Sequence, residues 1–198
     1  MSDKKPYDLV VTGARVLDPE SGLDAVQNIG IIDGRIKDLS LSPMHGNDVI
    51  QAVGLAAAPG FIDMHSHGQD DENYRAQAHD GVTTALELEV GTANVDGWYS
   101  SRTDSSLINY GASIGHIPIR MELMGDPGSI VPMSDTANLP CSQEEIEEIK
   151  SRLEVGLKQG ALAVGFGIQY TPGASRWEIL ESFRVAAKHD APCHVHMR

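Results

Sequence analysis

The chain has 198 residues, of which 15 are Lys or Arg and 28 are Asp or Glu, so its formal net charge at pH 7 is −13. An acidic chain without a basic cluster has no electrostatic footprint for nucleic acid or for an anionic membrane, so we expect neither as a partner. Hydrophobic residues make up 41% of the chain, enough for a packed core, and no segment approaches the ~18 consecutive apolar residues of a membrane span. Cys141 and Cys193 are too few for a disulfide framework, which favours a reducing, cytoplasmic location.

The first 58 residues predict a small β domain, which we interpret as part of a β-sandwich. Apolar and polar residues alternate in it, as they do in sheets with one face in water. Asp33 and Gly34 predict a hairpin, because both central residues of a type I′ turn need a positive φ. The expected strands cover residues 7–12, 15–17, 27–32, 35–39 and 48–53, with a turn at residues 13–14.

Residues 59–198 form the second predicted domain, in which strands alternate with helices. We expect strands near Phe61 and over residues 82–90, 114–121, 160–167 and 192–198. Capping boxes at Ser142 with Glu145 and at Ser175 with Glu178 predict two helix starts. Alternation of this kind predicts an α/β fold with a parallel sheet, either an open doubly wound sheet or a partial (β/α)8 TIM-type barrel. A complete barrel takes ~250 residues, so we expect a truncated barrel with about five strands.

The most informative motif is the apolar segment from Pro59 that ends in His65 and His67. Alternate residues of a strand share a face, which would place the two imidazoles roughly 6–7 Å apart along it. Neutral imidazole is a preferred ligand of zinc and related ions. The pair therefore predicts a metal site, with two hydrogen-bonded polar residues at a strand end as the alternative.

Two carboxylates on the next strand point to the same site. Strand alternation places Glu87 and Glu89 on one face of residues 82–90 and an apolar set on the other, so both glutamates are expected inside the barrel. A buried carboxylate is costly unless it is paired or bound to metal. Glu89 lies nearer the strand's carboxyl end, where barrel enzymes place their sites. The alternative is an edge strand with solvated glutamates.

Further candidates come from the ends of two strands. His194 and His196 share one face of the last predicted strand, and His196 lies nearer its carboxyl end, which makes it the preferred metal ligand. Asp63 shares the face of His65 and His67 and is expected to orient one of them, a common partner for a ligating histidine. Roles in structure alone stay open for Asp63 and His194.

Several segments carry a resemblance to known enzymes. Residues 59–67, after a short β domain, resemble the barrel entry of the amidohydrolase superfamily. Residues 115–125, 160–174 and 196–198 resemble the Gly-His…Arg…Met-Gly, Gly-Ala…Tyr…Pro-Gly and Ser-His-Ile-Arg segments of the N-acyl-D-amino-acid deacylase (D-aminoacylase) family. The resemblance covers nearly the whole chain.

The resemblance implies a zinc-dependent hydrolase that cleaves the N-acyl amide of a D-amino acid with water activated by one or two Zn²⁺ ions. His65 and His67 fall on the family's His-x-His motif, and His196 falls on the histidine of its fifth strand. His116 falls on a histidine of the third strand, and Tyr170 falls on a tyrosine beside the active site.

The chain departs from the family pattern at one metal ligand. The family has Asn-Cys-Gly after Gly-Val-Thr-Thr and uses that cysteine as a ligand, whereas residues 89–91 here are Glu-Val-Gly. Glu89 is expected to substitute, because zinc accepts carboxylate oxygens at similar distances. The resemblance also implies that the catalytic aspartate lies on a strand beyond Arg198, so we expect residues 1–198 alone to be inactive.

Deacylation of N-acyl-D-amino acids is therefore the expected function, with a small-molecule substrate and with a homo-oligomer left open. Cyclic-amide hydrolases of the dihydroorotase or hydantoinase type and isoaspartyl dipeptidase are the alternative enzymes with the same machinery. A catalytically silent scaffold is a third alternative, but it would be expected to lose its metal histidines, and all three are present.

Overall fold

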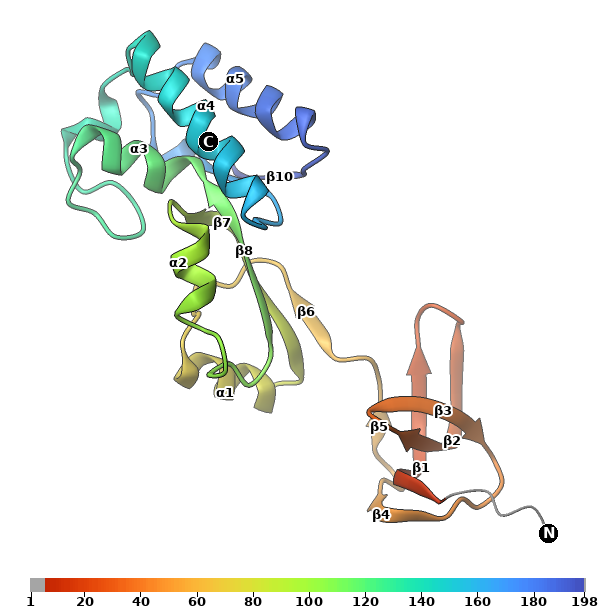
Figure 1. Cartoon of the computed structure of the whole chain (residues 1–198). Coiled ribbons are helices and arrows are strands. Elements are labelled where there is room, and N and C mark those ends of the chain that lie inside the picture. The colour runs from red at the N-terminus through yellow and green to blue at the C-terminus, as the bar shows by residue number, and fades with distance from the viewer. Residues whose placement is uncertain (1–5, 198) are drawn as a thin grey trace. The chain divides into compact units, whose positions relative to one another are not determined.

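The computed structural model describes residues 6–197, which separate into two compact units that meet between Pro59 and Gly60 in the sequence (Figure 1). Each unit is built on its own five-stranded sheet. No helix within residues 6–197 combines the length and the apolar character needed to cross a membrane.

The N-terminal unit is a mixed sheet organised around its first strand. β1 pairs antiparallel with β2 and parallel with β4 and β5, and β2 pairs antiparallel with β3. Within the described residues the unit has this single sheet, and the sandwich stays a prediction. The strands are β1 (Tyr7–Asp18), β2 (Leu23–Ile32), β3 (Arg35–Ser40), β4 (Gly46–Gln51) and β5 (Ala56–Ala57).

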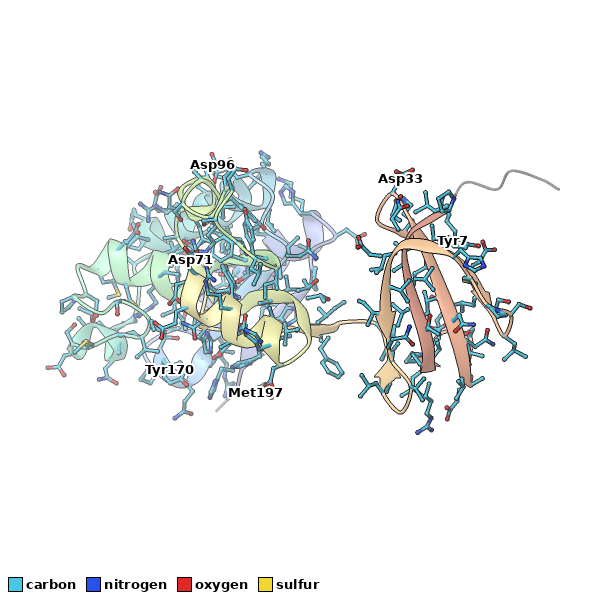
Figure 2. The ribbon with its side chains drawn as sticks, turned by 90° about the horizontal axis from the view of Figure 1, so that it is seen from below. Tyr7, Asp33, Asp71, Asp96, Tyr170 and Met197 are labelled. Atoms are coloured by element: carbon cyan, nitrogen blue, oxygen red, sulfur yellow. The ribbon has the colours of Figure 1, made fainter. Side chains whose placement is uncertain are left out.

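One predicted turn of this unit is confirmed and one is wrong. Asp33 and Gly34 have φ values of 51° and 68° and join β2 to β3, as a type I′ hairpin requires (Figure 2). At Gly13, where a turn was predicted, β1 continues through a β-bulge. Gly13 has a φ of 74°, and its N–H donates to Asn28 Oδ1 at 2.9 Å. Glycine tolerates this φ, so the extra residue is absorbed without ending the strand.

The C-terminal unit is a curled parallel sheet of neighbouring strands in chain order, β6 to β10, with helices between them (Figure 1). The strands are β6 (Phe61–Asp63), β7 (Val82–Thr92), β8 (Asn109–Gly115), β9 (Val164–Gly167) and β10 (Cys193–His196). The helices are α1 (Asp71–His79), α2 (Val95–Ser100), α3 (His116–Met124), α4 (Gln143–Lys158) and α5 (Arg176–Lys188), with short 3₁₀ helices η1 (Asp135–Asn138) and η2 (Ile168–Tyr170).

The two predicted capping boxes start α4 and α5. In each box the serine side chain accepts the backbone N–H of the glutamate three residues later, and that carboxylate accepts the serine N–H. The helices then bury an apolar face against the sheet, as their spacing predicts. The main core cluster consists of Val95, Ile114, Ile119, Ile149, Leu153, Val164, Phe166, Val185 and Ala186.

The strand predicted over residues 114–121 is wrong, because β8 ends at Gly115 and α3 begins at His116. Most of α3 is buried, so its sequence has no polar face. Without one, apolar residues do not recur every three to four positions, which is the pattern by which a helix is predicted. Pro118 is compatible with α3, because proline is tolerated in the first helical turn, where its missing N–H has no partner to lose. The preceding strand contains Gly111 and Ala112, which signal β structure weakly.

Candidate metal centre

His65 and His67 lie in the loop that follows β6 rather than on the strand itself, which ends at Asp63. The strand-face prediction for this pair is therefore wrong in detail. The backbone N–H of Ser66 donates to the Leu86 carbonyl at 3.0 Å, which ties the loop to β7. The two rings meet edge to face, with their Nε2 atoms 3.1 Å apart, so the loop brings the imidazoles closer than a regular strand would.

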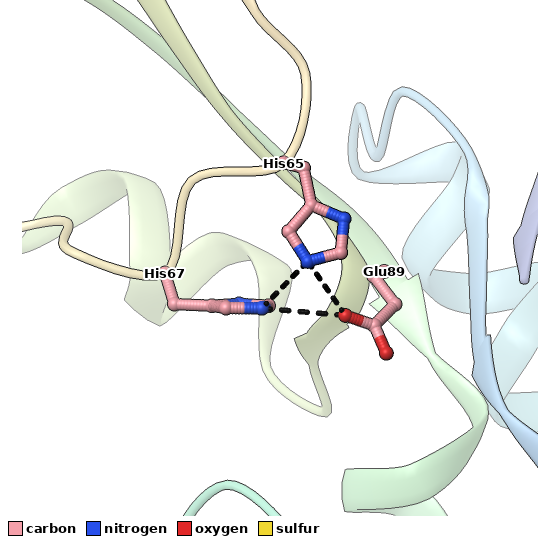
Figure 3. Close-up of side chains that lie close together, drawn as sticks. All are labelled: His65, His67 and Glu89. Atoms are coloured by element: carbon pink, nitrogen blue, oxygen red, sulfur yellow. Dashed lines mark hydrogen bonds and ion pairs between the residues drawn. The ribbon is translucent and has the colours of Figure 1, made fainter. Parts of the chain in front are cut away.

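Glu87 and Glu89 project from β7 and are both buried, at 7% and 5% exposure. Glu89 Oε2 lies 3.1 Å from His65 Nε2 and 3.3 Å from His67 Nε2 (Figure 3). Glu87 Oε2 lies 2.7 Å from His67 Nδ1, the opposite side of the same ring. Glu87 therefore sits behind His67, whereas Glu89 shares the space between the two imidazoles.

The end of β7 departs from regular strand geometry beside these carboxylates. Gly91 has a φ of 69°, and the pairing of β7 with β8 shifts register between Glu87 and Thr92. A Cβ on Gly91 would lie 2.3 Å from Ser113 Oγ, so only glycine fits there. Glu87 Oε1 accepts the N–H groups of Val90 at 3.2 Å and Gly91 at 3.3 Å, which fixes this carboxylate in the bulge.

His196 reaches the same cluster from β10, at the other edge of the sheet. Its Nδ1 lies 2.7 Å from Glu89 Oε1, and Tyr170 packs on it with ring centroids 4.8 Å apart. Three strand positions separate β10 from β7, about 14 Å in a flat sheet. The curl of the sheet closes that distance. Tyr170 Oη lies 3.4 Å from His196 Nδ1.

The side chains present fit a divalent metal ion. His65, His67 and Glu89 each offer one ligand atom, and these three atoms all lie within 4.8 Å of one another. The buried Glu89 Oε1 makes no hydrogen bond within the described residues, and its closest polar neighbour is His196 Nδ1 at 2.7 Å. A buried carboxylate oxygen in that state is costly. Imidazole and carboxylate donors suit zinc and its first-row relatives.

The carboxylates also control the protonation of His67. Burial by itself lowers the pKa of His67, but its hydrogen bond to Glu87 and the charges of Glu87 and Glu89 outweigh burial and raise that pKa. A carboxylate behind a histidine holds the ring in one tautomer and strengthens the other nitrogen as a ligand. Glu87 is in position to do this for the Nε2 atom of His67.

Three other predicted site residues take different places. Asp63 Oδ1 accepts the backbone N–H of His65 at 3.0 Å, so it orients the loop and not an imidazole. His194 is partly buried on β10, and its side chain makes no hydrogen bond or ion pair within residues 6–197. His116, expected on the third strand, is the first residue of α3 and lies outside the cluster. Arg198, part of the last matched motif, lies outside the described residues.

His116 belongs to a second, fully buried charge cluster that the sequence did not predict. Its Nε2 lies 2.8 Å from Glu178 Oε1, and the same oxygen accepts from Arg120 Nε at 3.1 Å. The only sequence signal was the capping box at Glu178, which reveals the helix start and not the partners of the carboxylate. This cluster joins α3 to α5.

Comparisons with known proteins identify the family of this chain. The model of the amidohydrolase family matches residues 56–198. The chain belongs to the amidohydrolase family. The D-aminoacylase of Alcaligenes xylosoxydans xylosoxydans is 25% identical over 233 aligned positions, which cover 100% of this chain and 46% of that protein. The resemblance to amidohydrolases and D-aminoacylases is thereby confirmed.

Two further similarities bear on fold and on alternatives. The crystal structure of N-acyl-D-glutamate deacylase from Bordetella bronchiseptica, complexed with zinc and a phosphonate inhibitor, matches with a TM-score of 0.79 and 23% identity. It covers 98% of this chain and 46% of that one and confirms the predicted fold class. A dihydroorotase of Geobacter sulfurreducens is 43% identical over 65 residues, 32% of this chain and 15% of that protein. The chain thus spans about half the length of the relatives that it matches throughout.

Proposed function

We propose that this protein is a metal-dependent hydrolase that removes the acyl group from N-acyl-D-amino acids. The observation that carries the proposal is the convergence of His65, His67 and His196 on the buried carboxylate of Glu89. The relative that matches the whole chain, a D-aminoacylase, supports this reaction class over the dihydroorotases, whose match covers about a third of it.

The metal centre that we propose uses His65, His67, Glu89 and His196 to hold one or two Zn²⁺ ions. Bound zinc acts as a Lewis acid and activates a water molecule at neutral pH. Glu89 takes the place that the resemblance gives to a cysteine, and its two oxygens face imidazoles from different elements, so it would hold the metal together with those histidines.

The other residues of the cluster position these ligands. Glu87 holds the Nδ1 side of His67, which leaves its Nε2 facing Glu89. Asp63 holds the backbone at His65, and Tyr170 packs on the ring of His196 with its hydroxyl beside that ring. The resemblance assigns proton transfer to an aspartate on a later strand, so we assign no proton-transfer role within residues 6–197.

We also propose a small-molecule amide as the substrate and a cytoplasmic location. Cys141 and Cys193 are both free thiols, which fits a reducing compartment. Burial raises the pKa of Cys141 to about 11, so this thiol is held in its unreactive, protonated form.

Metal analysis of the purified protein tests the proposal. The double substitution His65→Ala and His67→Ala should remove most of the bound zinc, whereas His79→Ala, a change of an exposed histidine at the end of α1, should leave the zinc content unchanged. Equal zinc content in the unmodified protein and the double variant would overturn the proposed centre.

A further inference from the structure

The segment of β7 that carries Glu89 leaves the regular ladder of the sheet. The pairing of β7 with β8 is interrupted between Glu87 and Thr92, and over that interval β8 advances by Ser113 alone. Residues 88–91, which form the Glu89 arch, therefore have more backbone than the facing strand can pair. A strand with extra residues bends out of the ladder, so the position of the Glu89 arch depends on contacts other than its pairing with β8.

The Glu89 arch rests on β9, the next strand but one. The sheet order places β8 between β7 and β9, which would separate the two strands by about 10 Å in a flat sheet. Yet a Cβ on the buried Gly165 of β9 would lie 2.3 Å from the carbonyl oxygen of Glu89 and 2.6 Å from that of Leu88. Nonbonded atoms do not approach so closely. The backbone of the arch therefore occupies the space that a side chain at Gly165 would need.

Ser113 of β8 lies in the narrow space between the arch and β9. Its side chain is fully buried, and its Oγ has no hydrogen-bond partner within the described residues. A Cβ on Gly165 would lie 2.5 Å from this Oγ, and a Cβ on Gly91 would lie 2.3 Å from it. A buried hydroxyl without a partner is costly, so the small volume of serine, rather than a hydrogen bond, accounts for this residue. The space between the strands has no room for a further methyl group.

β9 also fixes the position of β10, the strand that carries His196. The two strands pair in parallel, with His194 opposite Gly165 and His196 opposite Gly167. Because this ladder holds β10 against β9, the distance from β9 to the Glu89 arch also sets the distance from His196 to Glu89. That distance is short, 2.7 Å between His196 Nδ1 and Glu89 Oε1. A side chain that pushed β9 away from the arch would move His196 away from Glu89.

The loop between β6 and α1, which carries the other two histidines of the cluster, is held by β7 instead. The Ser66 N–H of this loop donates to the Leu86 carbonyl of β7, and β6 itself pairs with β7. A change at Gly165 should therefore displace His196 and leave those two histidines beside Glu89.

We propose that Gly165 is a positioning residue of the metal centre, because its lack of a side chain lets the Glu89 arch rest on β9 and so brings His196 to Glu89. The inference rests on the proposed metal centre and adds to it a residue that binds no metal itself. Gly165 does not have a positive φ, so its backbone conformation accepts alanine, and the expected effect of a side chain comes from the contact with the arch.

Zinc affinity of the whole protein, measured by competition with a chelator, tests the proposal. Gly165→Ala should weaken zinc binding about 10- to 100-fold, the usual effect of losing a group that orients a metal ligand. Gly111→Ala is the matched control and should bind zinc as the unmodified protein does. Gly111 is a buried glycine of β8 without a positive φ, and a Cβ there would meet the ends of the Leu162 and Leu86 side chains, which can move. Unchanged zinc affinity in Gly165→Ala would overturn the proposal.

A double-mutant cycle with His196→Ala separates positioning from a general loss of stability. If Gly165 acts through His196, Gly165→Ala should weaken zinc binding in the unmodified protein and have little further effect once His196 is alanine. A general destabilisation would weaken zinc binding by the same factor in both backgrounds. Equal factors would therefore refute the positioning role.

Hydrogen exchange of the unmodified protein gives a readout that needs no variant to fold. Zinc added to the metal-free protein should slow amide exchange at residues 164–167 of β9, because the ion ties β7 to β10 across that strand. Residues 35–40, in the N-terminal unit, are the control and should exchange at the same rate with and without zinc. If zinc binds and residues 164–167 gain no protection, the positioning role fails and the proposed metal centre stands.

Failure of the metal centre itself has a different signature. If the unmodified protein binds no zinc, the proposed centre fails, and the contact between Gly165 and the arch is tested on the metal-free proteins. There, Gly165→Ala should speed amide exchange at residues 88–91, and Gly111→Ala should not. Equal exchange at residues 88–91 in the two variants would show that Gly165 does not hold the arch.

Discussion

Glu89 occupies the position on which the candidate centre depends. One of its oxygens faces His65 and His67, and the other faces His196, so a single buried carboxylate connects histidines from opposite edges of the sheet. Glu87, two residues earlier on β7, bonds to the outer nitrogen of His67 and to the backbone N–H groups of the bulge. The two glutamates thus share a strand face and differ in what they can bind.

This difference predicts an order of effects for two matched substitutions. Glu89→Gln removes a proposed ligand and should reduce both zinc content and activity more than Glu87→Gln does. Glu87→Gln alters the partner of His67, a proposed ligand, and changing the partner of a ligating histidine typically costs about 10- to 100-fold in metal affinity or activity. Zinc titration and kcat/KM measured side by side check the order. A larger effect at Glu87 would mean that it is the ligand and Glu89 the partner.

At the scale of elements, α3 and α5 are joined by a buried ion cluster that lies apart from the metal centre. Glu178 and Arg120 are 0% and 2% exposed, and His116 bonds to the same carboxylate. Burial alone would raise the pKa of Glu178, but its hydrogen bond to His116 and the charges of His116 and Arg120 outweigh burial and lower that pKa. Because Arg120 also donates to the Thr136 carbonyl, the cluster connects the packing of α3 and α5 to the segment that precedes α4.

Glu178→Gln should therefore destabilise the protein by about 3 kcal/mol, because it leaves Arg120 buried without a charged partner. Glu145→Gln is the control, since Glu145 has the same place in a capping box and no buried partner; it should cost about 1 kcal/mol or less. Denaturant unfolding of both variants measures the contrast. Similar losses in the two variants would show that Glu178 acts only as a cap.

The stability difference between the unmodified protein and Glu178→Gln should change with pH in a defined direction. A carboxylate whose pKa is lowered on folding contributes its full stability above its ordinary pKa, here 4.5, and loses that contribution as the pH falls through the lower folded value. The stability gap between the unmodified protein and Glu178→Gln should thus shrink below about pH 4.5. A gap that widens on acidification would contradict the direction of the shift.

At the scale of the whole molecule, the candidate reactions differ in how much of the chain resembles the enzymes that catalyse them. The D-aminoacylase similarity runs through both units, whereas the dihydroorotase similarity covers 65 residues, 32% of the chain. A match over about a third of the chain carries less information about substrate, because one fold serves several reactions.

A substrate panel tests this reading on the whole protein. N-acetyl-D-amino acids should be hydrolysed faster than dihydroorotate or hydantoin is opened, because the segments around Tyr170 and His196 resemble the deacylases. The measured quantity is kcat/KM for each substrate class, and the double variant His65→Ala and His67→Ala is the inactive control. Faster ring opening would assign the protein to the cyclic-amide hydrolases, and cleavage confined to β-aspartyl dipeptides would assign it to the dipeptidases.

Much of the fold could be predicted from local patterns. Capping boxes specify helix starts through bonds between residues three apart, so α4 and α5 begin where the sequence predicts. The Asp33–Gly34 hairpin is equally local. The prediction was wrong for α3, where burial on nearly all sides removed the helical period, and at Gly13, where one glycine forms a bulge instead of a turn.

The amino-acid sequence by itself determined the family, the parallel α/β architecture and the candidate ligands, since each is encoded in short motifs or in the alternation of neighbouring residues. Only the tertiary structure decided which of these residues meet. His65 and His67 converge because their loop leaves the strand, and His196 reaches Glu89 because the sheet curls across three strand positions. His194 and His116 stay apart from the cluster for the same reason: contacts between distant segments depend on the path of the backbone, which no local pattern records.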